Sequence, residues 1–463
     1  MSKRVYLFFI AICVALTSLA QQPKYIFVFI GDGMGISPVQ AAEAYNREVL
    51  ADGTSLTMLQ FPVASMCQTY SASNPITDSA AAGTAIATGS KTRNGMLGMD
   101  ADTVAVASIA AQLHEMGYGV GICTSVSADD ATPGAFYAHV PYRKLYDQID
   151  LDAARSGFEF IAGAGMHSLV DADGNPTEAL QLMHRNGMEV YYGPEAIPTI
   201  NARSAVLLNP QGTPDWNIGY VIDGHEGRLT LPQITETCLK HLQSVSPDRF
   251  FMMVEGGSID HALHANDGGT AIREIINFDN ALKVAYQFYL EHPTETLIVV
   301  TADHDTGGMS RCHSSIGLKC PLRAFDYQHA SKEEFSDQCK AMLRDRRFYT
   351  WDDMKQILTE KFGLFDAIPV DEQAEQTLMD MFTSTFELRN TADQETLYAN
   401  FNSFAVEVFR LLNNAAGLRF TTTSHSGNPV PVFAVGVGAW RFAQFNNNID
   451  LPNHIRRIVG ISR

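Results

Sequence analysis

A nearly continuous apolar run, KYIFVFI at residues 24–30, ends in the glycine-rich turn GDGMG at residues 31–35. A strand with one exposed face alternates apolar and polar residues, whereas an unbroken apolar run is typical of a strand buried on both faces of a parallel sheet. Such a sheet needs helices on both sides. The run therefore favours an α/β fold.

Strand-like and helix-like segments alternate along the chain, as in α/β proteins. Apolar runs predict further strands at residues 120–124, 250–254, 297–301 and 430–437. Helical periodicity predicts helices at residues 104–116, 178–186, 231–243 and 270–291, and Ser37 and Pro38 predict the start of another, as N-cap and first helical residue. We expect a doubly wound, mainly parallel central sheet with helices on both faces. In such sheets ligands bind beyond the carboxyl ends of the strands.

Residues 310–420 depart from this alternation. Helical patterns dominate there and strand-like runs are few, with helices predicted at residues 332–346, 350–362, 371–386 and 393–412. We interpret this stretch as a mainly helical insertion within one domain that spans residues 21–463, and not as a second catalytic domain.

Residues 1–20 have the composition of a secretory signal peptide. Lys3 and Arg4 give a positive start, residues 5–16 form an apolar run too short to span a bilayer comfortably, and a small-residue cleavage site follows Ala20. Neither a later apolar run nor the C-terminal sequence predicts a membrane anchor. We therefore expect a periplasmic or secreted protein.

The formal net charge of −18 argues against nucleic acid or anionic membranes as partners. Of the seven cysteines, only Cys13 lies in the predicted signal peptide, so disulfides are permitted in the exported chain. Cys312 and Cys320 form the best candidate pair. Cys123 lies in a strand-like run, where a buried free thiol is the favoured interpretation.

Ser79 lies where an apolar helix of small residues is predicted to begin, in the run TDSAAAGTA at residues 77–85. Backbone N–H groups at a helix N-terminus favour negative charge, so a serine hydroxyl there is a candidate nucleophile for an anionic substrate. The alternative is that Asp78 or Ser79 is only an N-cap.

Acidic and histidine residues follow several predicted strands. Converging carboxylates repel one another unless cations lie between them, so their gathering at one sheet edge points to metal ions. Asp260 and His264 have i, i+4 spacing, which places both on one helix face, where they suit two positions around one zinc ion; a solvated helix face is the alternative. The strand-end residues are Asp32, Asp130, Glu255, Asp303 and His304, and His425 precedes a late strand.

The chain resembles the alkaline phosphatase family in motifs that occur in order over most of residues 24–308 and 420–440. They are FIGDGMG at 29–35, TDSAA at 77–81, DATP at 130–133, VEGGSID at 254–260, TADH at 301–304 and His425. The resemblance implies a phosphate-monoester hydrolase that forms a phosphoserine intermediate and binds two zinc ions and one magnesium ion. A homodimer is implied by the resemblance alone.

The resemblance also implies a role for each matching residue. Ser79 matches the nucleophile, and Arg143 matches the arginine that binds the phosphate. Asp130 matches a residue that holds the water ligands of magnesium, and His261 occupies a variable position near the substrate. The implied ligands are Asp260, His264 and His425 for one zinc, Asp32, Asp303 and His304 for the second, and Asp32, Thr132 and Glu255 for magnesium.

The alternatives to this function are a sulfatase, a phosphodiesterase and a non-catalytic metal- or phosphate-binding protein. Sulfatases of the same superfamily need a Cys or Ser in a C/S-x-P-x-R context, which the residues after Ser79 lack. Diesterases of the superfamily usually have threonine as nucleophile and lack the magnesium ligands. A non-catalytic metal- or phosphate-binding protein would be expected to have lost Ser79 or Arg143, and both are present.

Overall fold

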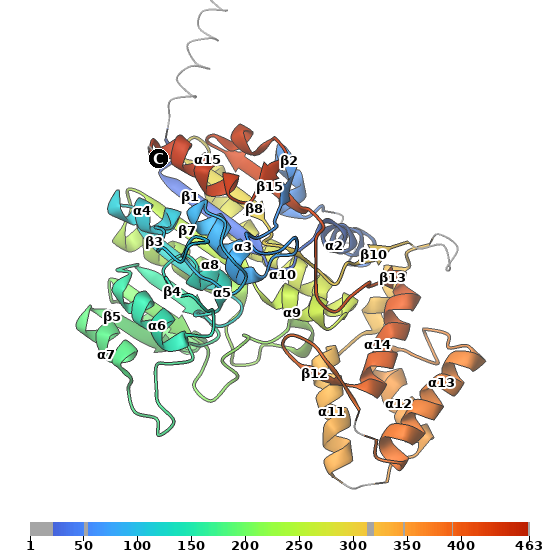
Figure 1. Cartoon of the computed structure of the whole chain (residues 1–463). Coiled ribbons are helices and arrows are strands. Elements are labelled where there is room, and N and C mark those ends of the chain that lie inside the picture. The colour runs from blue at the N-terminus through green and yellow to red at the C-terminus, as the bar shows by residue number, and fades with distance from the viewer. Residues whose placement is uncertain (1–21, 51–53, 313–318, 346–347, 391, 462–463) are drawn as a thin grey trace, which may run out of the picture.

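The computed structural model of the chain describes residues 22–50, 54–312, 319–345, 348–390 and 392–461. The predicted signal peptide lies outside these residues. The core is a ten-stranded sheet in the order β16-β2-β15-β8-β1-β7-β3-β4-β6-β5 (Figure 1). Its strands are β1 (Tyr25–Gly31), β2 (Val63–Gln68), β3 (Gly119–Thr124), β4 (Phe160–Gly163), β5 (Met188–Tyr192), β6 (Ser204–Leu208), β7 (Phe250–Gly256), β8 (Thr296–Thr301), β15 (Val430–Gly436) and β16 (Asn446–Asn447).

All strand pairs in this sheet are parallel except those of β15, which runs antiparallel to β8 and to β2. The apolar run that begins the domain forms β1, which is buried and lies between β8 and β7. In this register Ile30 is opposite both Glu255 and Thr301, so the residues that follow β1, β7 and β8 leave the sheet at the same edge. The predicted mainly parallel sheet is confirmed.

Two groups of helices cover the two faces of the sheet (Figure 1). One group is α2 (Ile36–Glu48), α8 (Leu231–Val245) and α10 (Gly268–Glu291), and the other is α3 (Ser79–Thr88), α4 (Ile109–Glu115), α5 (Ala131–Gly134) and α15 (Asp450–Val459). The remaining helices of the sheet region are α6 (Tyr146–Arg155), α7 (Glu178–Arg185) and α9 (Ser258–His264).

Two predicted helix starts are wrong. Helix α2 begins at Ile36 with Gly35 as N-cap, two residues earlier than Ser37 and Pro38 suggested. Helix α4 begins at Ile109 instead of residue 104, because the side chain of Ser108 accepts the backbone N–H of Ala111 and caps the helix there.

The stretch between β8 and β15 forms a helical unit to one side of the sheet (Figure 1). Its helices are α11 (Lys332–Arg344), α12 (Trp351–Phe362), α13 (Glu372–Phe382) and α14 (Ser403–Ala416), and they share an apolar core of their own. The two ends of the unit meet where β10 (Ser310–Arg311) pairs with β13 (Leu418–Arg419).

One helix predicted in this stretch is wrong over its first half. Residues 393–402 form a hairpin of β11 (Asp393–Glu395) and β12 (Asn400–Asn402), and the helix begins only at Ser403. Asn402 ends the hairpin and starts the helix, because its side-chain oxygen accepts the backbone N–H of Phe404 at 3.0 Å.

Among the described residues every cysteine is a free thiol. Cys312 and Cys320, the best candidate pair, are therefore not joined by a disulfide; burial and a hydrogen bond with the Cys312 thiol raise the pKa of Cys320 to about 11. Cys123 is a buried free thiol, as predicted.

No helix in the described part of the chain has the length and apolar character that crossing a membrane requires.

Candidate active site

The candidate residues gather beyond the carboxyl ends of four adjacent strands, β8, β1, β7 and β3. Asp32 follows β1, Asp303 and His304 follow β8, and Glu255 is the penultimate residue of β7. Since β15 runs in the opposite direction, the segment that precedes it, with His425, reaches the same edge. The topology thus brings together residues that are far apart in the sequence.

Ser79 is the first residue of α3, and Asp78 is the N-cap. The Asp78 carboxylate accepts the backbone N–H of Ala81 at 2.9 Å, so the capping role belongs to Asp78 and not to the Ser79 hydroxyl. Ser79 Oγ is buried and lies 3.1 Å from Nε2 of His304. The hydroxyl therefore faces the site from a position that favours negative charge.

Small residues in α3 bring it close to α5, the short helix that carries Thr132. A Cβ atom on Gly83 would lie only 3.2 Å from Cα of Thr132, so a larger residue would push the two helices apart. The run of alanine and glycine after Ser79 therefore does more than form a helix. It sets the distance between the serine and the residues at the end of β3.

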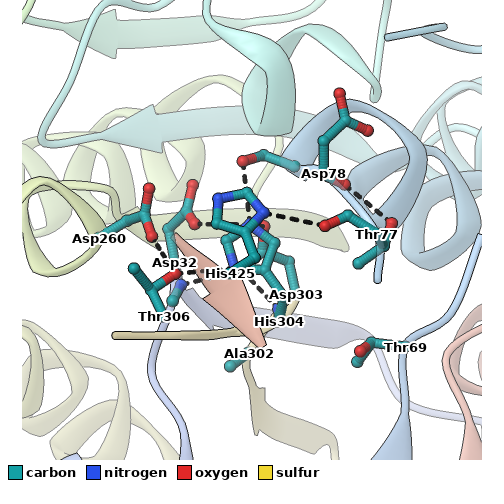
Figure 2. Close-up of polar contacts among 12 residues, drawn as sticks. Asp32, Thr69, Thr77, Asp78, Asp260, Ala302, Asp303, His304, Thr306 and His425 are labelled. Atoms are coloured by element: carbon teal, nitrogen blue, oxygen red, sulfur yellow. Dashed lines mark hydrogen bonds and ion pairs between the residues drawn. The ribbon is translucent and has the colours of Figure 1, made fainter. Parts of the chain in front are cut away.

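The carboxylates and imidazoles form two groups that share His304 (Figure 2). The first group contains Asp32, Asp303 and His304, and the second contains Asp260, His304 and His425; within each, one ligand atom from every residue lies within 4.8 Å of the others. His264 adjoins the second group, because its Nε2 lies 3.3 Å from Asp260 Oδ2 and 3.1 Å from His425 Nε2. Each group suits one metal ion.

Each of the three histidines is oriented by a hydrogen bond at Nδ1. Nδ1 of His264 donates to the carbonyl oxygen of Thr423 at 2.6 Å, and Nδ1 of His425 donates to that of Thr77 at 2.9 Å. Nδ1 of His304 lies 3.2 Å from Oγ1 of Thr306. A hydrogen bond at Nδ1 fixes the ring and leaves Nε2 to bind a metal. All three Nε2 atoms face the two groups.

Buried oxygen atoms of the site lack hydrogen-bond partners within the described ranges. They are Oδ1 of Asp32, Oγ1 of Thr132, Oε1 of Glu255, Oδ2 of Asp260 and Oδ2 of Asp303. Leaving such atoms without a partner is costly in a protein interior, and bound cations remove that cost. The oxygen set therefore fits metal ions.

The pKa values of the buried carboxyls also indicate a site for metal ions. Burial, and then the charges of Asp303, Asp260 and Glu255, raise the pKa of Asp32 well above its ordinary value. Burial raises the pKa of Glu255 to about 8 and that of Asp303 to about 7, with neighbouring carboxylates adding to both. A raised pKa means that a carboxyl gives up its proton less readily, and a bound cation would remove the repulsion that raises it.

Glu255 lies beside an all-oxygen set at the end of β3. Its Oε2 accepts a short hydrogen bond from Thr124 Oγ1, and its Oε1 is left without a partner among the described residues. Thr132 is buried nearby, and its side chain lowers the pKa of Glu255, against the effect of burial. Such oxygen ligands are those that magnesium prefers.

Arg143 is held between two carboxylates. Its Nη2 lies 2.9 Å from Oδ1 of Asp130, and its Nη1 lies 3.9 Å from Oδ2 of Asp78. Burial favours the neutral form of Asp130, but the Arg143 guanidinium outweighs it and keeps the pKa of Asp130 below its ordinary value. Asp130 therefore orients the arginine, whose planar fork matches two phosphate oxygens.

His261 is buried in helix α9, directly after Asp260. Burial is the main reason that the pKa of His261 falls to about 4, so the ring is neutral at physiological pH. Its ring centroid lies 3.9 Å from that of Tyr398 and 6.0 Å from that of Trp216.

Several residues of the site were not predicted from the sequence. Thr124 binds Glu255, Thr306 Oγ1 donates a short hydrogen bond to Asp260 Oδ1, and Tyr398 reaches the site from the helical unit. Thr124 and Thr306 lie at or just beyond strand ends, so the strand-end pattern that predicted Asp32 and His304 also indicates these two residues. Tyr398 carried no such signal, because its segment was assigned to a helix.

A comparison with known protein families identifies the family of this chain. The family model for alkaline phosphatase matches residues 23–172 and 214–461. The chain therefore belongs to the alkaline phosphatase family, and it is an enzyme that hydrolyses phosphate monoesters, as its similarly named relatives do. The family depends on metal ions, which agrees with the two groups of candidate ligands described above.

Individual relatives agree over most of the chain. Alkaline phosphatase 4 of Bacillus subtilis is 27% identical over 446 residues, which cover 94% of this chain and 88% of that protein. The crystal structure of a cold-active alkaline phosphatase from Shewanella sp. is 25% identical, covers 95% of this chain and 100% of that one, and has a TM-score of 0.78. Thermus thermophilus alkaline phosphatase, 23% identical with a TM-score of 0.78 over 96% of this chain and 93% of its own, shares the fold.

Proposed function

We propose that the chain hydrolyses phosphate monoesters through a phosphoserine at Ser79, with two zinc ions and one magnesium ion. The observation that supports this most directly is the position of Ser79 Oγ. It lies at the N-terminus of α3 and 3.1 Å from Nε2 of His304, and the neighbouring Asp78 contacts Arg143. The proposed nucleophile and the proposed phosphate-binding arginine therefore both adjoin Asp78.

The ligand sets follow from the two groups and the oxygen cluster. Asp260, His264 and His425 are assigned to one zinc ion, Asp32, Asp303 and His304 to the second, and Asp32, Thr132 and Glu255 to magnesium. Imidazole-rich sets suit zinc, whereas all-oxygen sets suit magnesium. When bound, two zinc ions stabilise the attacking and the leaving oxygen of an in-line displacement.

The chain's own residues then bind the ester and carry the phosphoryl group. Arg143 donates two hydrogen bonds to nonbridging phosphate oxygens, and Asp130 holds the guanidinium in that orientation. Ser79 Oγ forms a bond to phosphorus as the ester P–O bond breaks, which releases the alcohol and leaves a phosphoserine. Water then cleaves the phosphoserine to inorganic phosphate and restores the serine hydroxyl.

A side-by-side assay of three ester classes tests this proposal. The metal-loaded protein is given a phosphate monoester, a phosphate diester and a sulfate ester, and its zinc and magnesium contents are measured on the same sample. We expect the monoester to be preferred by orders of magnitude, with two zinc ions and one magnesium ion per chain. A preference for the diester or the sulfate ester would contradict the proposal.

We further propose that residues 1–20 are removed on export to the periplasm or medium, and that residues 21–463 form one domain. Residues 310–420 would then be an insertion, which the pairing of β10 with β13 at its base supports. A homodimer is proposed from the family resemblance, and light scattering of the purified protein tests it. Mass spectrometry of the exported protein locates its first residue.

A further inference from the structure

The hairpin of β11 and β12 extends from the helical unit to the candidate active site. Its tip, residues 396–399, is a tight turn in which Thr396 donates two hydrogen bonds to the carbonyl oxygen of Ala399, from its N–H at 3.0 Å and from its hydroxyl at 2.7 Å. Tyr398 lies in this turn. The tip is therefore an ordered structure that holds one aromatic residue in place.

The Tyr398 side chain is half-buried against the helix that carries three site residues. Its ring centroid lies 3.9 Å from that of His261, with the planes inclined by 38°, and 5.2 Å from that of His264, nearly perpendicular at 80°. Offset and edge-on arrangements of this kind are the favourable ones for aromatic rings. Tyr398 thus forms part of the wall of the site.

A buried lysine fixes the hairpin to the same helix. Lys332 Nζ donates to the carbonyl oxygen of Ala265, which directly follows α9, at 2.7 Å, and to Oε1 of Gln394 in β11 at 3.4 Å. The same ammonium lies 4.7 Å from the centroid of the Phe401 ring in β12. Because Lys332 contacts both strands and the end of α9, the hairpin has a defined position relative to the site.

The Tyr398 hydroxyl is available as a donor. It makes no hydrogen bond to any residue in the described part of the chain, while the Arg143 guanidinium and the Asp260 carboxylate both act on it electrostatically. A hydroxyl donor within electrostatic reach of the Arg143 guanidinium suits an anionic ligand.

We propose that Tyr398 is a substrate-binding residue supplied by the helical unit, whose hydroxyl donates a hydrogen bond to an oxygen of the bound phosphate monoester, beside Arg143. This inference rests on the proposed function. It gives the helical unit a direct part in the site, because the hairpin that carries Tyr398 belongs to that unit.

The test compares Tyr398→Phe with wild-type protein, both loaded with zinc and magnesium. The substitution removes one oxygen atom and keeps the ring against His261. Affinity for inorganic phosphate is measured by calorimetry, and KM and kcat are measured with p-nitrophenyl phosphate. A hydrogen bond to a charged group is worth about a tenfold change in binding, so we expect the Kd for phosphate and the KM to rise by roughly tenfold.

Leu397→Ala is the matched control, because Leu397 is the neighbouring residue of the same turn and is 58% exposed. We expect it to leave both constants unchanged. Unchanged phosphate affinity and KM in Tyr398→Phe would overturn the inference, and so would an equal change in Leu397→Ala. If wild-type protein hydrolysed no monoester, the proposed function would fail, while the phosphate affinities would still decide the role of Tyr398.

Discussion

Asp78 connects three parts of the candidate site, so its replacement by alanine is expected to affect both stability and activity. Its Oδ1 accepts the N–H of Ala81 at 2.9 Å and caps α3, and its Oδ2 accepts the N–H of Gly95 at 2.8 Å. The Gly95 carbonyl in turn accepts the N–H of Arg143 at 2.7 Å. The nucleophile helix and the arginine segment are thus joined through one carboxylate.

The two lost hydrogen bonds set the expected size of the stability change. Removal of an aspartate N-cap costs about 1 kcal/mol, and loss of a second hydrogen bond costs about as much. The contact with Arg143 at 3.9 Å is long and adds little. We expect Asp78→Ala to lower the free energy of unfolding by about 2 kcal/mol.

The activity change follows from the same geometry. Ser79 directly follows the cap, and a misplacement of reacting groups by about 1 Å lowers rates by as much as 100-fold. We therefore expect kcat/KM of Asp78→Ala for a phosphate monoester to fall by about 10- to 100-fold. Urea unfolding of the metal-loaded protein gives the stability change, and steady-state kinetics with p-nitrophenyl phosphate gives kcat/KM.

Asp78→Ser is the control, since a serine hydroxyl can still accept the N–H of Ala81 but offers no second oxygen to Gly95. We expect it to recover about half of the lost stability, about 1 kcal/mol. An alanine variant with unfolding free energy within about 0.5 kcal/mol of wild type and kcat/KM within about twofold would refute the reasoning.

Metal removal and pH give two further predictions. Dialysis against a strong chelator is expected to abolish monoester hydrolysis and to lower the Tm, because the unpartnered carboxylates then face one another. Addition of zinc and magnesium should restore both activity and Tm. Full activity after such dialysis would contradict the metal assignment. Burial raises the pKa of Glu274 from 4.5 to about 8, so the folded protein keeps this proton up to about pH 8, whereas the unfolded chain releases it near pH 4.5. The stability gained from the bound proton is therefore fully present below pH 4.5 and is lost as pH rises through 8. Between pH 5 and 9, wild type should lose a few kcal/mol more unfolding free energy than Glu274→Gln, whose amide oxygen can still accept the N–H of Val221. Equal pH dependence of the two proteins in urea unfolding would contradict this.

The sequence alone was sufficient for the centre of the fold and most of the candidate site. The apolar runs of β1, β7 and β8 are buried on both faces, so they lack alternation and are recognisable without neighbours. Parallel strands direct their carboxyl ends to one edge, so residues at several strand ends, such as Asp32 and His304, were expected to meet. The small-residue helix after Asp78 made Ser79 a candidate nucleophile but left a capping role open, and the family resemblance implied the nucleophile role.

Local sequence patterns did not predict the outer strands or the hairpin. β4 has only four residues, and Cys67 is the one fully buried residue of β2, so neither strand is a long apolar run. The hairpin around Tyr398 depends on contacts made by Lys332 and Ser336, which lie 60 or more residues earlier in the chain. A pattern read within a short window does not contain such contacts.

The central claim is that Ser79 carries the phosphoryl group, and acid quenching during turnover tests it most directly. Metal-loaded protein is mixed with a phosphate monoester, quenched in acid and digested, and the phosphorylated peptide is identified by mass spectrometry. We predict phosphoserine at Ser79, and we predict that Ser79→Ala lacks it and loses turnover by orders of magnitude with unchanged zinc content. A phosphoryl group on another residue, or a Ser79→Ala variant with near wild-type turnover, would contradict the account.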